Sequence, residues 1–117
     1  MAYVDGFVVP VPVENLAAYK KLARKAGRIW REHGALRYVE CAGDHIPVGK
    51  RTDFNRSVKL KEGETVIFSW ILYKNRRHRD AVMKKVMADP RLKMDPKTMP
   101  FDGKRLIWGG FKTFIEL

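Results

Sequence analysis

Cysteine is nearly absent from this chain, and its one copy, Cys41, has no partner for an internal disulfide. Three histidines accompany it without the spacing of zinc ligands. No apolar run has membrane-spanning length, and the first twelve residues contain Asp5 where a signal peptide would need a basic segment followed by an apolar one. We therefore expect a cytoplasmic protein with no metal site and no membrane contact.

Acidic residues are scarce relative to basic ones. The 117 residues include 24 Lys and Arg but 13 Asp and Glu, which gives a formal net charge of +11. Such a charge attracts anions, whether nucleic acid, anionic lipid or acidic metabolites. The net charge alone does not indicate which of these is the partner. Hydrophobic residues make up 45% of the chain, so we expect one ordinary globular domain over residues 1–117.

The spacing of apolar residues predicts six main elements in the order βαββαβ. Strands are expected where apolar residues alternate or run together, and helices where they recur every three to four residues. The predicted strands are Tyr3–Val9, Ala35–Ala42, Thr65–Tyr73 and Lys104–Glu116, and the predicted helices are Glu14–His33 and Arg76–Ala88.

Glycine, proline and asparagine mark the predicted ends of these elements. Gly34 is expected to stop the first helix and Asn75 to cap the second. Pro10 and Pro12 are expected to end the first strand, because proline cannot donate a hydrogen bond to a ladder. A brief alternation at Ser57–Lys61 suggests a short additional edge strand.

The order βαββαβ is that of a ferredoxin-like fold, an α+β class in which both helices cover one face of a four-stranded antiparallel sheet. The other face would then meet water. The third predicted strand is apolar on both sides, with Phe68 and Trp70 on one and Ile67 and Ile71 on the other. Because a monomer rarely exposes so much apolar surface, we expect a homodimer whose sheets pack face to face, a dimeric α+β barrel.

Charged residues occur at positions where apolar ones are expected. Arg79 lies within the apolar stripe of the second helix, so it should point inward and need a carboxylate from Asp5, Glu40 or Asp102. The result would be either a salt bridge that locks helix to sheet or an anion-binding site. Asp5 and Glu40 lie in apolar strands, where a buried carboxylate acts as a general base or is satisfied by a cation or a backbone amide.

Other residues complete the candidate site. His33 ends the apolar arc of the first helix, either as a packed helix-end side chain or as a base. Trp70 and Trp108 would wall a planar ligand, or belong to the core or the dimer interface. Arg105 follows the turn at Asp102, which is expected to accept local backbone hydrogen bonds, and would lie near a cleft.

The glycine pair Gly109–Gly110 interrupts the last predicted strand. Glycine inside a strand marks a bulge or a point where another part of the chain comes close to the backbone. We favour these structural interpretations over a ligand-binding one.

Four segments of the sequence resemble, over essentially its whole length, the YbaA-like bacterial family known as domain of unknown function 1428. They are YVDGFVVPVP at Tyr3–Pro12, EHGALRYVEC at Glu32–Cys41, VIFSWILYKNRRHRDAV at Val66–Val82 and MPFDGKRLIWGGF at Met99–Phe111. The family is similar to the dimeric α+β barrels, which include cofactor-free monooxygenases and haem-degrading enzymes. The resemblance implies this fold and a homodimer but no established activity. No histidine matches a haem-ligand motif, so we expect no cofactor.

Two functional hypotheses remain open at this point. The first is a small-molecule-binding or cofactor-independent oxygenase-like dimer, with polar groups from Asp5, Glu40, Arg79 and His33. The second is a basic dimer that binds nucleic acid weakly through the cations of its helices, or that acts as a structural scaffold. The outward cations of the first helix have no aromatic residue among them, which disfavours nucleic acid.

Overall fold

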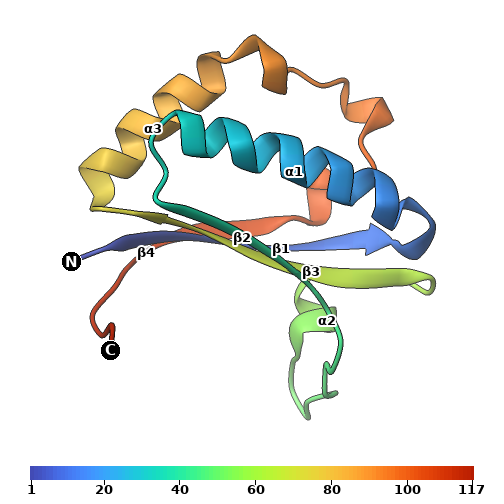
Figure 1. Cartoon of the computed structure of the whole chain (residues 1–117). Helices are drawn as coiled ribbons and strands as arrows, with labels where there is room; N and C mark the ends of the chain where they lie inside the picture. The colour runs from blue at the N-terminus through green and yellow to red at the C-terminus, as the bar shows by residue number, and fades with distance from the viewer.

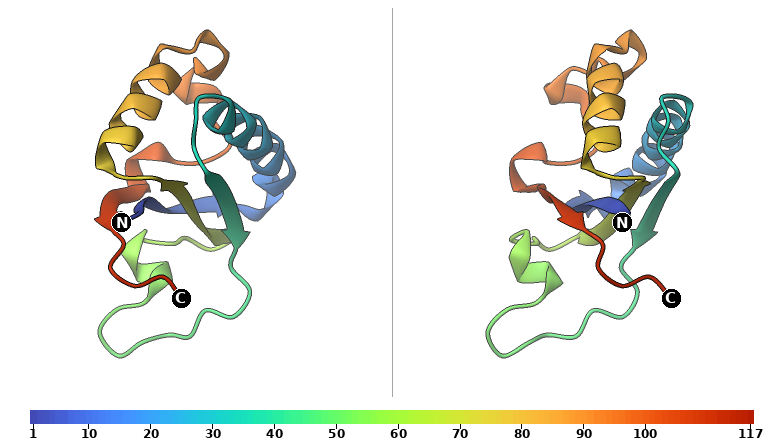
Figure 2. Two further views of the ribbon diagram at one scale, coloured as in Figure 1. Left: turned by 60° about the vertical axis from the view of Figure 1, so that its left-hand side comes forward. Right: turned by 90° about the vertical axis from the view of Figure 1, so that its left-hand side faces the viewer.

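The sheet has four strands: β1 at Tyr3–Pro12, β2 at Arg37–Ala42, β3 at Glu64–Tyr73 and β4 at Ile107–Lys112. They are antiparallel and lie in the order β2-β3-β1-β4 in the computed structural model, which describes residues 1–117 (Figure 1). Two long helices cover one face of the sheet, and a short helix lies on the other side (Figure 2). The helices are α1 at Leu16–Glu32, the short α2 at Phe54–Ser57 and α3 at Arg76–Ala88. The predicted α+β class is confirmed.

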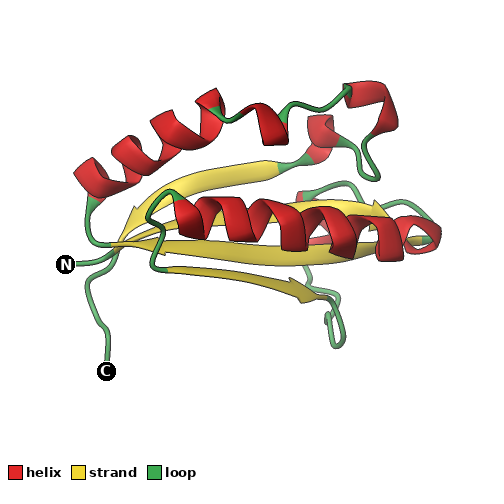
Figure 3. Ribbon diagram, turned by 45° about the horizontal axis from the view of Figure 1, so that its top comes forward, coloured by secondary structure: helices red, strands yellow, loops and turns green.

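Helix α1 runs beside β2 at one edge of the sheet (Figure 3). Tyr19 and Ile29 on its apolar side are buried, whereas the basic residues on its opposite side are exposed. A 3-10 turn at Val13–Asn15 leads into the helix. Gly34, with φ at 115°, follows its end in a left-handed conformation that glycine adopts without strain, as predicted. No helix is both long enough and apolar enough to cross a membrane.

Helix α3 begins and ends as predicted. The side chain of Asn75 accepts a hydrogen bond from the backbone N–H of His78, which satisfies one of the free donors of the first turn. Asp89 is extended, as expected for a residue before proline, and ends the helix. Val82 and Val86 are fully buried and pack into the core under the helix.

Strand β1 continues through both prolines, so the predicted end before them is wrong. The N–H of Val13 donates to the Gly63 carbonyl at 2.8 Å, so the odd-numbered residues of β1 bond to β3. Pro10 and Pro12 therefore have their missing N–H on the other side of the strand. On that side β4 pairs with β1 only as far as Val8, and proline is tolerated where no partner needs a donor.

The predicted edge strand is wrong, and the last strand is shorter than predicted. Residues 57–61 form no edge strand: Ser57 ends α2, and the buried Val58 is followed by Lys59 at φ 51°. Their apparent alternation comes from a turn that buries one apolar side chain. Strand β4 begins at Ile107 and ends at Lys112, because residues 103–105 form a 3-10 turn and the chain leaves the sheet afterwards.

The two faces of the sheet differ in what covers them. The face toward α1 and α3 holds the core, which includes Tyr3, Val9, Val11, Ile67, Ile71 and Tyr73. On the other face, which we call the bare face, Phe68, Ile107 and Phe111 are 43%, 45% and 62% exposed. Phe54 of α2 contacts Phe68 edge to face and covers part of it. The two apolar sides predicted for β3 are thus confirmed.

Candidate functional site

A cavity of about 260 Å³ lies between α1, the sheet and the segment that joins α3 to β4. Every residue that lines it is hydrophobic except Glu40 and Ser69. Three methionines, Met87, Met94 and Met99, form part of its wall, and their flexible thioethers adapt to differently shaped ligands. An apolar cavity with a few polar groups is the usual composition of a small-molecule site.

Two tyrosines hold Glu40 at the wall of this cavity. The Tyr19 hydroxyl donates to Oε1 at 2.5 Å, and the Tyr38 hydroxyl donates to Oε2 at 2.7 Å. Tyr38 and Glu40 are two residues apart in β2, so both side chains lie on the helix-covered face. Gly27 makes room in α1, because a side chain there would collide with the Tyr38 ring. Sequence spacing and a small helix residue together build the cluster.

Glu40 keeps hydrogen-bonding capacity for a ligand. Burial, together with the Glu40 carboxylate, raises the pKa of Tyr19 and of Tyr38, so both phenols stay protonated and remain donors. A carboxylate has about four lone-pair sites, and the two tyrosines occupy one on each oxygen. The remaining sites can accept a hydrogen bond from a ligand, and Glu40 is the only carboxylate that lines the cavity.

Arg79 forms an ion pair with Asp5 beneath α3, so the inward direction predicted for Arg79 is confirmed. Its Nε lies 3.1 Å from Oδ1 of Asp5, which is fully buried, while the Arg79 side chain is 15% exposed. The contact lacks hydrogen-bond geometry, and neither Asp5 oxygen accepts a hydrogen bond. Burial raises the pKa of Asp5, and the charge of Arg79 offsets only part of this effect. Of the three candidate carboxylates, the structure pairs Arg79 with Asp5.

Gly110 allows this ion pair to fit. The pairing of β1 with β4 continues without interruption through Gly109–Gly110, so the bulge considered for the glycine pair is wrong. A side chain at Gly110 would collide with the Tyr3 hydroxyl and the Arg79 guanidinium, which confirms the alternative of a close approach. The guanidinium lies 5.2 Å from the Tyr3 ring and 6.0 Å from the Trp108 ring, within cation–π range.

His33 joins the end of α1 to the segment after α3. Its Nε2 lies 2.8 Å from Oδ2 of Asp89. Arg91 donates to both oxygens of Asp89 and, at 2.7 Å, to Glu32. Hydrogen bonds from Arg91, then from His33, hold the pKa of Asp89 far below its ordinary range. These are the contacts of a packed helix end, and none of the four residues lines the cavity.

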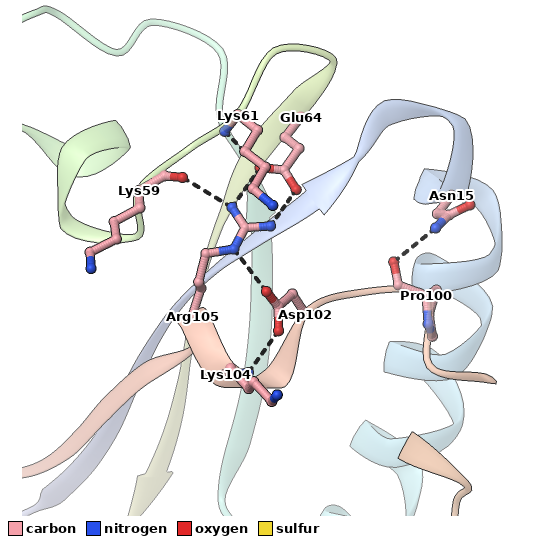
Figure 4. A network of polar contacts seen from close by, with 8 residues as sticks. All are labelled: Asn15, Lys59, Lys61, Glu64, Pro100, Asp102, Lys104 and Arg105. Carbon is pink, nitrogen blue, oxygen red and sulfur yellow. Dashed lines mark hydrogen bonds and ion pairs between the residues drawn. The ribbon is translucent and has the colours of Figure 1, made fainter. Parts of the chain in front are cut away.

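Arg105 connects the turn before β4 to the start of β3 (Figure 4). Its guanidinium donates to both oxygens of Glu64 at 2.8 and 2.7 Å and to Asp102 at 2.9 Å. Asp102 also accepts from the backbone N–H of Lys104 at 2.9 Å, so the predicted role of Asp102 in the turn is confirmed. The hydrogen bonds from Arg105 lower the pKa of Glu64 and of Asp102. This network fixes the end of the segment that forms one wall of the cavity.

The structure does not bring the eight predicted site residues together. Trp70 lies on the bare face, 5.5 Å from the Arg37 guanidinium, whereas Trp108 lies on the helix-covered face. The two tryptophans therefore cannot line the same pocket within a single chain. Asp5 and Arg79 form a cluster near Trp108, and Asp102 pairs with Arg105 before β4. His33 lies at the end of α1, and Glu40 lines the cavity.

Sequence reasoning missed the two tyrosines as partners of Glu40. The signals were present, since Tyr38 alternates with Glu40 in a predicted strand and Tyr19 lies on the apolar arc of the predicted helix. Together they place all three side chains between helix and sheet. The methionines of the cavity wall had no comparable signal, because residues 89–106 carry no periodic pattern.

The match to a family model covers residues 2–103, and that family is described as "Protein of unknown function (DUF1428)". The chain belongs to the DUF1428 family. It is similar to the "Uncharacterized protein YbaA" of Escherichia coli (strain K12) and of Shigella flexneri, each 52% identical over 116 residues and aligned over 99% of both chains. Among solved structures, the "De novo designed protein Foldit4" aligns over 99% of this DUF1428 chain and 100% of its own, with 11% identity and a TM-score of 0.45.

Proposed function

We propose that this DUF1428 protein binds a small, mainly apolar molecule that carries one hydrogen-bond donor. The observation that carries the proposal is an apolar cavity of about 260 Å³ whose only carboxylate, Glu40, is held in place by Tyr19 and Tyr38. An apolar cavity of about 150 Å³ can hold benzene, so this volume suits one substituted aromatic ring. The ring would contact the methionines and aromatic side chains, and its hydroxyl or N–H would donate to Glu40.

Titration calorimetry with para-ethylphenol tests this proposal. Ala26 lines the cavity, so Ala26→Leu should fill it and weaken binding at least about tenfold. Ala18 is exposed on the same helix, so Ala18→Leu should leave the affinity unchanged. Ethylbenzene, which lacks the donor, should bind more weakly than the phenol. Absence of binding, or equal weakening by both substitutions, would contradict the proposal.

The resemblance to cofactor-free monooxygenases extends the proposal to an enzymatic form. Glu40 would accept the hydroxyl proton of an electron-rich phenol, and a ring carbon of the resulting phenolate would form a C–O bond with dioxygen. Loss of water from the ring hydroperoxide, with the O–O bond broken and the ring hydrogen removed, would leave a quinone. The support for this step within the chain is the Glu40 carboxylate beside the cavity. Dioxygen uptake with a hydroquinone, above its rate in buffer and lost in Glu40→Gln, is the expected result. Binding without uptake would restrict the protein to a binding role.

The homodimer is part of the same proposal. The bare face exposes Phe68, Ile107 and Phe111, and apolar surface of this kind supports packing against the sheet of a second chain. Sedimentation equilibrium should give twice the chain mass. Phe111→Glu should yield a monomer, because a carboxylate buried between two sheets without a partner is strongly unfavourable. A monomeric wild-type protein would refute the dimer while leaving the cavity proposal standing.

A further inference from the structure

Strand β2 lies at an edge of the sheet, and its outer side has no partner strand (Figure 3). The N–H of Gly43 donates to the carbonyl of Val66 at 2.8 Å in the register of the β2–β3 ladder, so the odd-numbered residues of β2 bond to β3. Tyr38, Glu40 and Ala42 therefore direct their backbone N–H and C=O groups away from the sheet. Such a row of free groups is a template for another extended chain.

A groove of about 1190 Å³ follows this edge between β2 and α1. Lys20, Arg24 and Arg28 line it from the helix and are exposed. They are four residues apart, so they form one row with steps of about 6 Å along the helix. None of the three forms an ion pair with a carboxylate. Their charges are available to a partner.

The acidic residues of the groove do not neutralise this row. Glu32 pairs with Arg91 at 2.7 Å. Glu40 accepts hydrogen bonds from two tyrosines and forms no ion pair with the row. A fourth cation, Arg31, donates to the carbonyls of Ala35 and Leu36 and so stays at the end of the groove. The groove therefore combines a free strand edge with an unpaired row of positive charge.

We propose that this groove binds an acidic peptide in extended conformation, which adds to β2 as a fifth strand of the sheet. Alternate side chains of an extended chain recur roughly every 6.6 Å, close to the step along the helix row. Asp or Glu at every second position would thus face Lys20, Arg24 and Arg28 while the peptide backbone pairs with β2. The proposal is separate from the ligand of the apolar cavity.

Other occupants match the groove less well. A second copy of this chain would bring two identical rows of cations together, on chains that each carry a net charge of +11. Single-stranded nucleic acid would satisfy the cations but leave the free backbone groups of β2 without a regular partner. The two aromatic side chains that line the groove, Tyr19 and Tyr38, donate hydrogen bonds to Glu40, and Tyr19 is only 8% exposed, so they offer little surface on which bases could stack.

Fluorescence anisotropy with a labelled peptide of alternating Glu and Val, blocked at both ends, tests the charge row. The variant Lys20→Glu with Arg24→Glu should weaken binding roughly tenfold or more, as two ion pairs become repulsive. Lys21→Glu with Lys25→Glu makes the same change of charge on α1 outside the groove, and should weaken binding less than about threefold. Equal effects of the two variants would overturn the proposal.

The backbone part of the proposal has its own test on the unaltered protein. A peptide of the same sequence with alternate backbone nitrogens methylated cannot complete a ladder and should lose at least about tenfold in affinity. Amide exchange at Tyr38, Glu40 and Ala42 should slow when the unmodified peptide binds. Ala42→Pro, which removes only an outward N–H, should weaken binding as well. Undiminished binding of the methylated peptide would overturn the proposal. So would an oligodeoxythymidylate that binds more tightly than the unmodified peptide and displaces it, because that result would point to nucleic acid.

Discussion

Asp5 and Glu40 are both carboxylates on apolar strands, on the same face of the same sheet, yet their surroundings differ. Asp5 is fully buried beside the cation of Arg79, and the Gly110 backbone closes the space around them. Glu40 accepts hydrogen bonds from two neutral phenols and lines a cavity. The position of a carboxylate in an apolar strand therefore does not by itself indicate a ligand-binding site. Adjacent space and unused lone pairs distinguish the ligand-binding candidate from the structural one.

Removal of Arg79 should have the largest effect, because it leaves the Asp5 carboxylate buried without its cation. Arg79→Ala should lower the free energy of unfolding by about 3–5 kcal/mol, measured by urea denaturation. The variant Asp5→Leu with Arg79→Met replaces the pair by apolar groups of similar size and should recover most of that loss. A loss below about 1 kcal/mol for Arg79→Ala would show that the pair does not lock helix to sheet.

Substitution of Gly110 should have the next largest effect. Gly110→Ala places a methyl group against the Tyr3 hydroxyl and the Arg79 guanidinium, so we expect a loss of about 2 kcal/mol in unfolding free energy. Gly109→Ala is the matched control, because its methyl group would lie 3.6 Å from the Phe111 ring, an ordinary contact distance. Similar stabilities for the two alanine variants would contradict a specific close approach at Gly110.

Changes in the Glu40 cluster should cost less stability than changes in the Asp5 pair. Tyr38→Phe removes one hydrogen bond while Tyr19 still donates to Glu40, so we expect a loss of about 1 kcal/mol by urea denaturation. Tyr38→Phe should also change the affinity for para-ethylphenol. The double variant Asp5→Leu with Arg79→Met should leave that affinity unchanged. A Tyr38→Phe cost as large as that of Arg79→Ala would remove the contrast between the two clusters.

The pH dependence of stability should separate Glu64 from Asp5. Hydrogen bonds from Arg105 lower the folded-state pKa of Glu64, so its stabilisation is complete above the unfolded pKa of about 4.3 and is lost as pH falls through the lower folded value. Burial raises the pKa of Asp5, so protonation of Asp5 at low pH removes part of the free-energy cost of burying its charge. Glu64→Gln should thus reduce the slope of Tm against pH below about pH 4. An unchanged slope would contradict the role of Glu64.

The ends of the helices and the direction of Arg79 were predictable, because interactions between residues close in sequence determine them. Gly34 and Asn75 mark helix ends through backbone conformation and capping, and Arg79 points inward because it replaces an apolar residue in the helix stripe. The partner of Arg79 was not predictable, because the choice among three carboxylates depends on the strand register and on where α3 crosses the sheet. The prolines of β1 were misjudged for the same reason, since tolerance depends on whether a neighbouring strand needs their N–H.

The cavity was the least predictable feature. The sequence places Tyr19 in a predicted helix and Tyr38 in a predicted strand, but their meeting at Glu40 depends on Gly27 and on how α1 lies over β2. Its outer wall comes from residues 89–106, whose path is fixed by 3-10 turns and by the network around Arg105. Periodicity has no information about such a segment.

The most direct test of a ligand-binding cavity beside Glu40 is the nuclear magnetic resonance of the methionine methyl groups during titration with para-ethylphenol. The chain has five methionines, of which Met87, Met94 and Met99 line the cavity while Met1 and Met83 do not. We predict saturable shifts for the three cavity methyl groups and none for the other two. No shift at saturating phenol, or shifts that include Met83 and Met1 equally, would contradict the account.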